Sequence, residues 1–235
     1  GVVLAFPHKE NIKAILEEKV AVLQLYWGEC SKELVLEAHN AGVKVVPQVG
    51  SVEEAKKALN VGVDAIIVQG REAGGHVIGQ EGLISLLPQV VDLVGDRDIP
   101  VIAAGSIVDA RGYVAALTLG AKGICMGTRA RWPGAPHRVL QTPFFCDWKS
   151  LPVHENETTQ PIIGRSIIHG VEKEIRRFAG TVPNPTTTGD IESMAMYAGQ
   201  SVGLIKEIVP AGEVVKRLVE GAQLAIQQIL SGESV

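Results

Sequence analysis

A histidine that follows a glycine-rich turn is the strongest candidate for chemistry in this sequence. Residues 63–69 form an apolar, β-branched run that ends at Gly70, and His76 comes directly after Gly74 and Gly75. Such a run is typical of a buried parallel strand. We therefore expect His76 in the loop beyond the carboxyl end of that strand, where α/β folds place their chemistry. By position alone, a turn histidine without a chemical role fits equally well.

Two further strand ends carry glycines that could approach a phosphate. Gly105 and Ser106 follow one apolar run, and Gly127 and Thr128 follow the next, while Asp109 opens a helical pattern. In barrels, the loops after the last two strands often bind a phosphate through backbone N–H groups and a helix N-terminus. Ser106 and Thr128 could add hydroxyl donors. The pattern favours a phosphate-bearing ligand over two simple tight turns.

These residues are set in an alternation of strand-like runs and helical patterns. The strand-like runs are residues 2–6, 20–26, 43–48, 65–69, 100–104 and 123–126. The helical patterns are residues 12–18, 31–40, 52–60, 83–94 and 110–119. Ser51 and Glu54 have the spacing of a capping box, and glycines follow several helices as C-terminal stops. The alternation predicts a (β/α) array, either an open doubly wound sheet or a (β/α)8 barrel with about six of its eight strands.

The periodicity changes in the second half of the chain. Residues 130–165 predict irregular structure, and residues 171–179 predict a helix. A helical end follows from 191 to about 231, as a C-terminal helical extension. We therefore divide the chain into residues 1–129, which carry the strands and candidate sites, and residues 130–235, an irregular segment with C-terminal helices packing on the barrel.

The composition excludes several classes of protein. The 235 residues are 46% hydrophobic and only 4% aromatic, with a net charge of −4. A nucleic-acid partner is not expected, because neither a basic face nor stacking aromatics are available. No apolar run has membrane-spanning length, and no histidines or cysteines have metal-ligand spacing. We expect no signal peptide. We expect a cytoplasmic location, with an organelle left open, and no bound metal.

Four motifs of the chain resemble those of a known family. The chain is similar to nitronate monooxygenases of the plant type, formerly called 2-nitropropane dioxygenases, which are FMN-dependent (β/α)8 barrels. The resemblance rests on residues 69–76 (QGREAGGH), 100–105 (PVIAAG), 126–129 (MGTR) and 197–203 (YAGQSVG). It implies oxidative denitrification of alkyl nitronates or nitroalkanes, with O2, to carbonyl compounds and nitrite.

The resemblance also assigns roles to individual residues. It implies that His76 takes a proton from a neutral nitroalkane or donates a hydrogen bond to a nitronate, a task suited to an imidazole pKa near neutrality. The remaining implied positions are the FMN phosphate site at Gly105, Ser106, Gly127 and Thr128, the flavin ring at Gly75 and Gln48, and the substrate side at Gln200 and Ser201. For Gln200 and Ser201, a role as the polar start of a helix is an equally good interpretation.

The chain departs from this family in three places. The six strands correspond to the third to eighth of the barrel, so two exposed sheet edges are expected, which favour self-association or a homo-oligomer. The sequence after Arg129 has the character of a deletion, and Ser106 replaces a common second glycine. These departures keep two alternatives open: an FMN-dependent enoyl reductase-like oxidoreductase, and an inactive truncated isoform without flavin chemistry.

Overall fold

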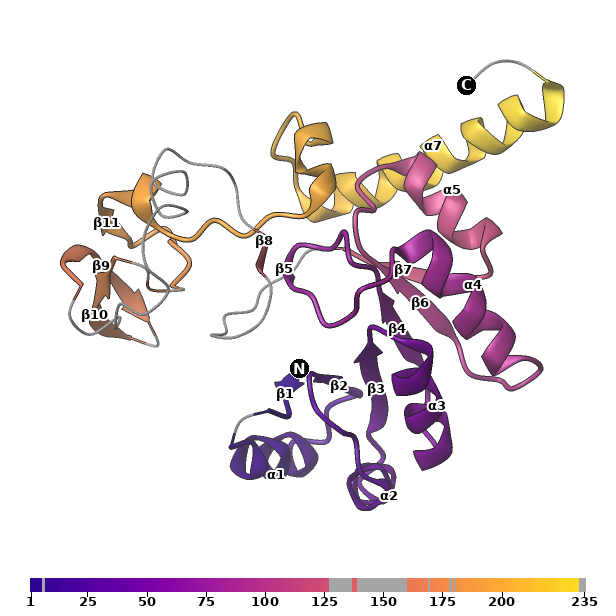
Figure 1. Cartoon of the computed structure of the whole chain (residues 1–235), viewed down its shortest axis with the longest axis horizontal. Coiled ribbons are helices and arrows are strands. Elements are labelled where there is room, and N and C mark those ends of the chain that lie inside the picture. Colours follow the sequence, from indigo (N-terminus) through magenta and orange to yellow (C-terminus); the bar gives the residue numbers. More distant parts are fainter. Residues whose placement is uncertain are drawn as a thin grey trace. The chain divides into compact units, whose positions relative to one another are not determined.

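Six parallel strands form the sheet that positions the candidate site (Figure 1). In spatial order they are β1 (Val2–Val3), β2 (Val22–Tyr26), β3 (Lys44–Val49), β4 (Ile66–Gln69), β6 (Val101–Ala104) and β7 (Gly123–Cys125). Between them lie α1 (Lys9–Glu17), α2 (Lys32–Asn40), α3 (Val52–Val61), α4 (Leu83–Val94) and α5 (Ala110–Thr118). Each strand and helix falls on a run predicted from the sequence. The predicted α/β fold of the (β/α)8-barrel class is therefore confirmed.

The computed structural model describes residues 1–5, 7–126, 137–138, 160–168, 170–177, 179 and 181–232. They belong to two units. The first unit consists of Gly1–Ala73, Val77–Gly127 and Gln200–Val235, and the second of Gly74–His76 and Thr128–Gly199. In the described part of the chain, no helix combines the length and the apolar character that crossing a membrane requires.

Short polar side chains cap the N-termini of three helices, α2, α3 and α5. The hydroxyl of Ser51 accepts the N–H of Glu54 at 3.2 Å, as the capping-box spacing predicts. The Glu54 carboxylate accepts the N–H of Gly50 at 2.7 Å, one residue earlier than in the usual motif. At the other end of α3, Gly62 has a φ of 85°, so the predicted glycine stop is confirmed.

Alternate strand residues face opposite sides of the sheet, and both sides are packed. Ile66 and Val68 belong to the large core between the sheet and the helices, in which most members are fully buried. Ala65 and Ile67 belong to a smaller cluster on the other face, together with residues of β3 and β6. This second face carries polar side chains toward the carboxyl ends of the strands, among them Gln69, which is 3% exposed.

The C-terminal part of the first unit is one long helix after a short 3-10 turn. The 3-10 helix η3 spans Gln200–Leu204, and α7 spans Ala211–Ser231. Helix α7 packs on α5, where a Cβ at Gly221 would lie 2.7 Å from the Ala110 Cβ. The prediction of a helical end from residue 191 is wrong before α7. Only short 3-10 turns form there, and Pro210, which cannot donate a helical hydrogen bond, precedes the helix.

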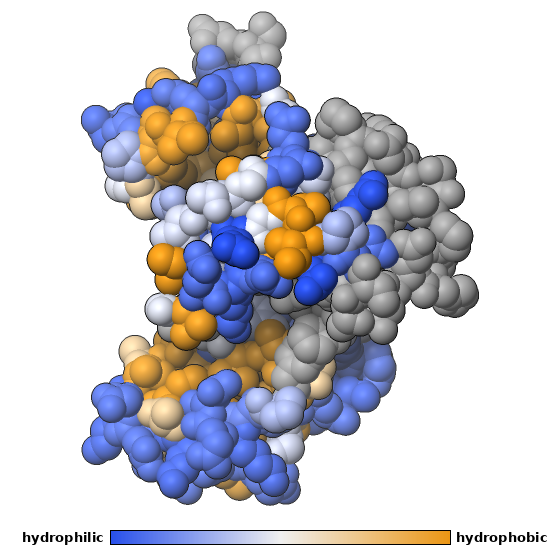
Figure 2. All heavy atoms as spheres, turned by 90° about the vertical axis from the view of Figure 1, so that its left-hand side faces the viewer, coloured by the Kyte–Doolittle hydropathy of each residue, from blue (hydrophilic) through white to orange (hydrophobic). Residues whose placement is uncertain are grey.

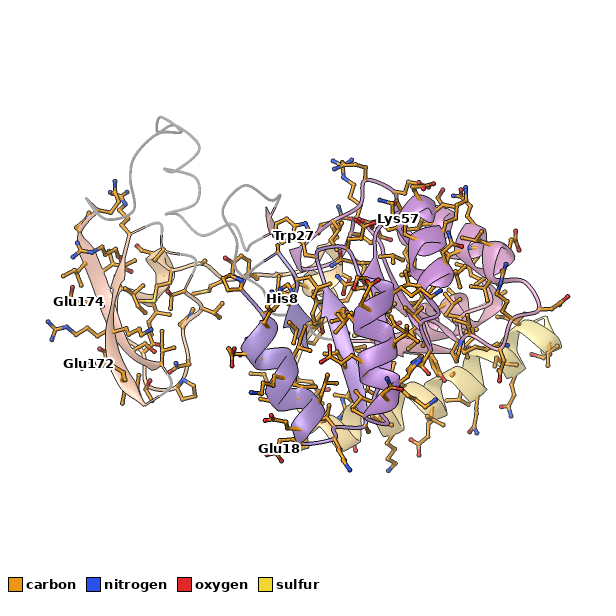
Figure 3. All side chains as sticks on the ribbon, turned by 90° about the horizontal axis from the view of Figure 1, so that it is seen from below. His8, Glu18, Trp27, Lys57, Glu172 and Glu174 are labelled. Carbon is orange, nitrogen blue, oxygen red and sulfur yellow. The ribbon has the colours of Figure 1, made fainter. Side chains whose placement is uncertain are left out.

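The second unit contains an antiparallel sheet that the sequence did not predict. Strand β9 (Ile162–Ile168) pairs with β10 (Val171–Arg176) on one side and β11 (Thr188–Gly189) on the other. The helix predicted over residues 171–179 is therefore wrong, and so is the irregular structure predicted for residues 162–165, the first part of β9. Along β10 only Ile175 is buried, whereas Glu172 and Glu174 project from one exposed face of the strand (Figure 3).

A turn glycine and contacts between the strands explain why this segment forms a hairpin and not a helix. Gly170, between the two strands, has a φ of 78°, which suits a tight turn and would end a helix. Across the strands, Glu174 forms an ion pair with Arg165 at 3.8 Å. On the opposite face of β9, the buried Ser166 hydroxyl accepts a hydrogen bond from Thr187 at 2.9 Å. These contacts join residues distant in sequence and are invisible to a periodicity argument.

Candidate active site

The candidate site begins where β4 and β6 end side by side. Gln69 of β4 is in register with Ala104 of β6, and the N–H of Gly70 donates to the carbonyl of Ala104 at 2.9 Å. The loop that leads to His76 and the loop that contains Gly105 therefore start as neighbours. Placing the ends of parallel strands together in this way is what the fold supplies to a site.

The segment between β4 and α4, residues 70–82, contains His76 and is called the histidine loop. Its first part, the outgoing limb that leads from β4 to His76, is held by Glu72. The half-buried Glu72 carboxylate accepts the N–H of Leu83 at 2.8 Å, at the start of α4. The residue at the N-cap of α4 is Gly82, which has no side chain to cap the helix. Glu72 therefore does the work of a capping residue from eleven residues away, and its charge suits the positive end of the helix.

The part of the histidine loop that follows His76, the returning limb, is held by a glutamine at the end of β4. The buried Gln69 accepts the N–H of Ile78 through Oε1 at 3.1 Å. A side chain at Gly79 would overlap the backbone of Gly50, so the two loops meet at glycines. Sequence reasoning missed Gln69, although a polar residue that ends a wholly apolar strand is a recognisable signal. The residues on either side of the Gly74–His76 segment are thus fixed within the first unit.

Gly75 and His76 form the two-residue strand β5. Gly75 has a φ of 71°, a conformation that favours glycine. β5 pairs with β8 (His137–Arg138), in which His137 is the residue opposite His76. This pairing could not be predicted from the sequence, because β8 is only two residues long and lies in a segment without periodicity.

The loop after β6 has an unusual backbone. Gly105 has a φ of 127° and Ser106 a φ of 52°, so two successive residues lie in the region that favours glycine. The Ser106 hydroxyl donates to the backbone carbonyl of Glu72 at 2.8 Å. Its single hydrogen is therefore engaged inside the protein. Within the described residues, no hydrogen bond occupies the backbone N–H of Ser106 or Ile107.

The N-terminus of α5 is already capped by its own residue. The Asp109 carboxylate accepts the N–H groups of Arg111 and Gly112, at 3.0 and 3.4 Å. The side-chain hydrogen bond from Arg111 lowers the pKa of Asp109 below its usual range, so the cap is anionic at neutral pH. A phosphate would therefore meet the N–H groups of Ser106 and Ile107 rather than the first turn of the helix. These N–H groups, which no described residue occupies, and the glycine-like backbone fit such a group.

The remaining predicted positions are distributed unevenly. Gln200 begins η3, and its N–H donates to the Glu72 carbonyl at 3.1 Å, with Ser201 next in the chain. Gln48 lies half-buried in β3, in register with Ile67 of β4. Gly127 and Thr128 lie outside the described residues. The structure thus brings Ser106 and Gln200 together on one carbonyl group, that of Glu72.

A parallel sheet of the (β/α)8-barrel type, with glycine-rich loops at the ends of adjacent strands, places this chain in the (β/α)8-barrel class of folds. Comparison with known proteins narrows the class. The family model described as "Nitronate monooxygenase" matches residues 2–131. The chain therefore belongs to the nitronate monooxygenase family, whose members are flavin-dependent oxidoreductases.

Individual relatives agree with the family match. A nitronate monooxygenase of Neurospora crassa is 32% identical over 85% of this chain and 59% of its own length. A probable nitronate monooxygenase of Staphylococcus aureus is 41% identical over 83% of this chain and 57% of its own length. Among solved structures, FabK from Thermotoga maritima matches with a TM-score of 0.76 at 27% identity, over 98% of this chain and 77% of that one. The chain thus spans somewhat more than half the length of these curated relatives.

Proposed function

We propose that this chain is part of an FMN-dependent enzyme that converts alkyl nitronates or nitroalkanes, with O2, to carbonyl compounds and nitrite. The observation that carries the proposal is the extent of the family match. It spans residues 2–131 and so includes the histidine loop, the Gly105–Ser106 loop and Gln48. Two relatives that align over more than four-fifths of the chain carry the name nitronate monooxygenase.

The flavin would be held by backbone groups of this chain. We assign its phosphate to the N–H groups around Gly105 and Ser106, together with Gly127 and Thr128. Gly75 and Gln48 are assigned to the side of the flavin ring. When bound, the flavin supplies the redox chemistry, and the protein supplies position and proton handling.

His76 is assigned the proton chemistry. With a neutral nitroalkane, its imidazole takes the proton from the carbon that bears the nitro group, which leaves the nitronate anion and an imidazolium. With a preformed nitronate, no proton needs to be removed, and His76 donates a hydrogen bond to the anion. Gln200 and Ser201 are assigned to the substrate side of the same site, and the Gln200 backbone contact with Glu72 supports that placement.

A flavin-retention and turnover experiment tests the proposal. The purified chain is mixed with FMN, passed through gel filtration and examined by visible absorbance. It is then assayed for oxygen uptake and nitrite release with a primary alkyl nitronate. Near-stoichiometric flavin with nitrite release supports the proposal. Retained flavin with NADH or NADPH oxidation and enoyl thioester reduction, but no nitrite, would favour the enoyl reductase-like alternative. A colourless, folded protein would favour an inactive isoform.

A further inference from the structure

We propose that Glu72 is a positioning residue that couples the histidine loop to the Gly105–Ser106 loop and to the turn at Gln200. This inference deepens the proposed function and rests on it for the role of His76. Glu72 is assigned no contact with substrate or flavin. Its effect is exerted through the backbone that leads to His76, four residues further along the chain.

Three hydrogen bonds to two atoms of Glu72 carry the inference. Its carboxylate Oε1 accepts the N–H of Leu83, while its backbone carbonyl accepts both the Ser106 hydroxyl and the Gln200 N–H. The three distances are 2.8, 2.8 and 3.1 Å. One residue therefore joins the starts of α4 and η3 with the ends of β4 and β6. No other residue assigned to the site links as many elements by its described hydrogen bonds.

The absence of a side chain at Gly70 leaves room for the Glu72 carboxylate. A Cβ at Gly70 would lie 2.8 Å from Glu72 Oε2, so a side chain at position 70 would displace the carboxylate. A Cβ at Gly82 would make only an ordinary van der Waals contact with the same oxygen, at 3.6 Å. Leu83, whose N–H is the partner, is a buried core residue with 6% exposure. The carboxylate therefore satisfies a helix N–H that has little access to water.

Fixing Glu72 at both its side chain and its carbonyl restricts the peptide that follows. Ala73 is buried at 2% exposure, and Val77 on the far side of the segment at 7%. Without the carboxylate, the outgoing limb loses its attachment to α4, while the returning limb stays held by Gln69. The expected result is a displaced His76 rather than a lost fold. A displacement of about 1 Å at a catalytic group lowers rates by up to about 100-fold.

Three variants separate positioning from general stability. Glu72→Ala removes the carboxylate, whereas Glu72→Gln keeps an oxygen that can accept the Leu83 N–H. Glu81→Gln is the matched control, since Glu81 lies just before α4 and its carboxylate accepts hydrogen bonds from the exposed side chains of Ser85 and Gln89. The backbone carbonyl of Glu81, which accepts the Arg71 N–H, is unchanged in this variant. For each variant, kcat/KM per bound flavin is measured with a neutral nitroalkane and with its preformed nitronate.

The ratio of the two values is the readout, because lost stability lowers both in proportion. We expect Glu72→Ala to lower the nitroalkane-to-nitronate ratio by about 10-fold or more, with Glu72→Gln and Glu81→Gln within about 3-fold of the wild type. A ratio that is unchanged in Glu72→Ala would overturn the positioning role, whether or not both rates fall.

Amide hydrogen exchange keeps this inference separate from the proposed function. We expect faster exchange in peptides covering residues 73–78 of Glu72→Ala, with Glu72→Gln close to the wild type. Should the wild type turn over neither substrate, the proposed function fails while the exchange result still decides the coupling. Unchanged exchange in Glu72→Ala would then overturn it.

Discussion

The Ser106 hydroxyl donates a hydrogen bond to the backbone carbonyl of Glu72, 2.8 Å away, from a residue whose φ is 52°. A left-handed backbone costs a residue with a Cβ about 1 kcal/mol relative to glycine. The hydrogen bond offsets a cost of that size, since such bonds contribute about 1 kcal/mol. Ser106 is thus able to stand in a conformation that favours glycine because its own side chain holds it there.

Replacing Ser106 separates the strain from the hydrogen bond. Ser106→Ala keeps the Cβ and loses the bond, so we expect its unfolding free energy in urea to fall by about 1 kcal/mol. Ser106→Gly loses the bond but also removes the strain, so its stability should stay within about 0.5 kcal/mol of the wild type. Ser85→Ala, which removes an exposed hydroxyl bonded to Glu81, is the control. A glycine variant less stable than the alanine variant would contradict this account.

Replacing His76 tests its proposed role as a base. His76→Asn keeps a polar side chain that can donate a hydrogen bond but cannot take the proton. We expect turnover of a neutral nitroalkane to fall by about 100-fold or more, the usual contribution of a general base, and nitronate turnover to fall by less than about 10-fold. Steady-state nitrite release with both substrates measures this. Equal losses on the two substrates would rule out proton removal by His76.

Replacing Asp64 tests an electrostatic cluster at the opposite ends of the strands. Asp64 Oδ2 lies 2.8 Å from both the Val45 nitrogen and His39 Nε2, and Oδ1 lies 3.6 Å from Lys44 Nζ. Burial acts to raise the pKa of Asp64, but the hydrogen bonds from Val45 and His39 and the neighbouring positive charges lower it below its usual range. We expect Asp64→Asn to lose about 1–2 kcal/mol of stability at pH 7.

The pH dependence of this loss has a defined sign. Because the folded-state pKa lies below the unfolded value of about 3.9, the stabilisation is complete above that pH and disappears as the pH falls through the folded pKa. Urea unfolding of wild type and Asp64→Asn at several pH values should therefore show curves that converge in acid. Asp96→Asn, an exposed carboxylate after α4, should run parallel to the wild type. If the difference in unfolding free energy between the wild type and Asp64→Asn persisted at the lowest pH, the stabilisation would not come from the Asp64 charge.

The alternation of strands and helices in residues 1–126 could be predicted from sequence because each element there has a local signal. Apolar runs end at glycine, and helices begin at Ser31, Ser51 and Asp109, whose side chains accept N–H groups of the first turn. By contrast, β10 carries its charges as Glu-Lys-Glu and is a strand only because β9 pairs with it. Tertiary pairing of this kind overrides local propensity.

The sequence predicted the candidate-site residues that belong to a recognisable motif. It did not predict the residues that hold the loops of the site in place. Gly105, Ser106 and His76 stand out because glycine-rich strand ends have a recognisable chemistry. Glu72 and Gln69 act through contacts with Leu83 and Ile78, which lie eleven and nine residues away. The roles of Glu72 and Gln69 depend on the path of the histidine loop back to the sheet, and that path cannot be predicted from a single sequence.

The exposed apolar face of α7 predicts that this chain self-associates. Beside the residues that pack on α5, the helix exposes a second apolar stripe. Figure 2 shows that orange, apolar side chains interrupt the hydrophilic surface of the molecule in several places. The stripe consists of Val215, Val219, Ile226, Ile229 and Leu230, each between 44% and 81% exposed. Its spacing matches one face of a helix, and a contiguous apolar face of this kind marks an interaction surface.

Sedimentation velocity over a range of protein concentrations measures the association. We expect a concentration-dependent shift for the wild type and none for the double variant Ile226→Glu and Leu230→Glu, because two charges on the stripe make its burial unfavourable. Gln223→Glu with Gln227→Glu adds the same charge at exposed polar positions of α7 and should behave as the wild type. Association that survives the stripe variant would instead place the contact at the edge strands β1 and β7, whose outer sides have no partner strand among the described residues. A monomer at every concentration would contradict the prediction, since it would mean that this apolar area stays in water without a second copy to cover it.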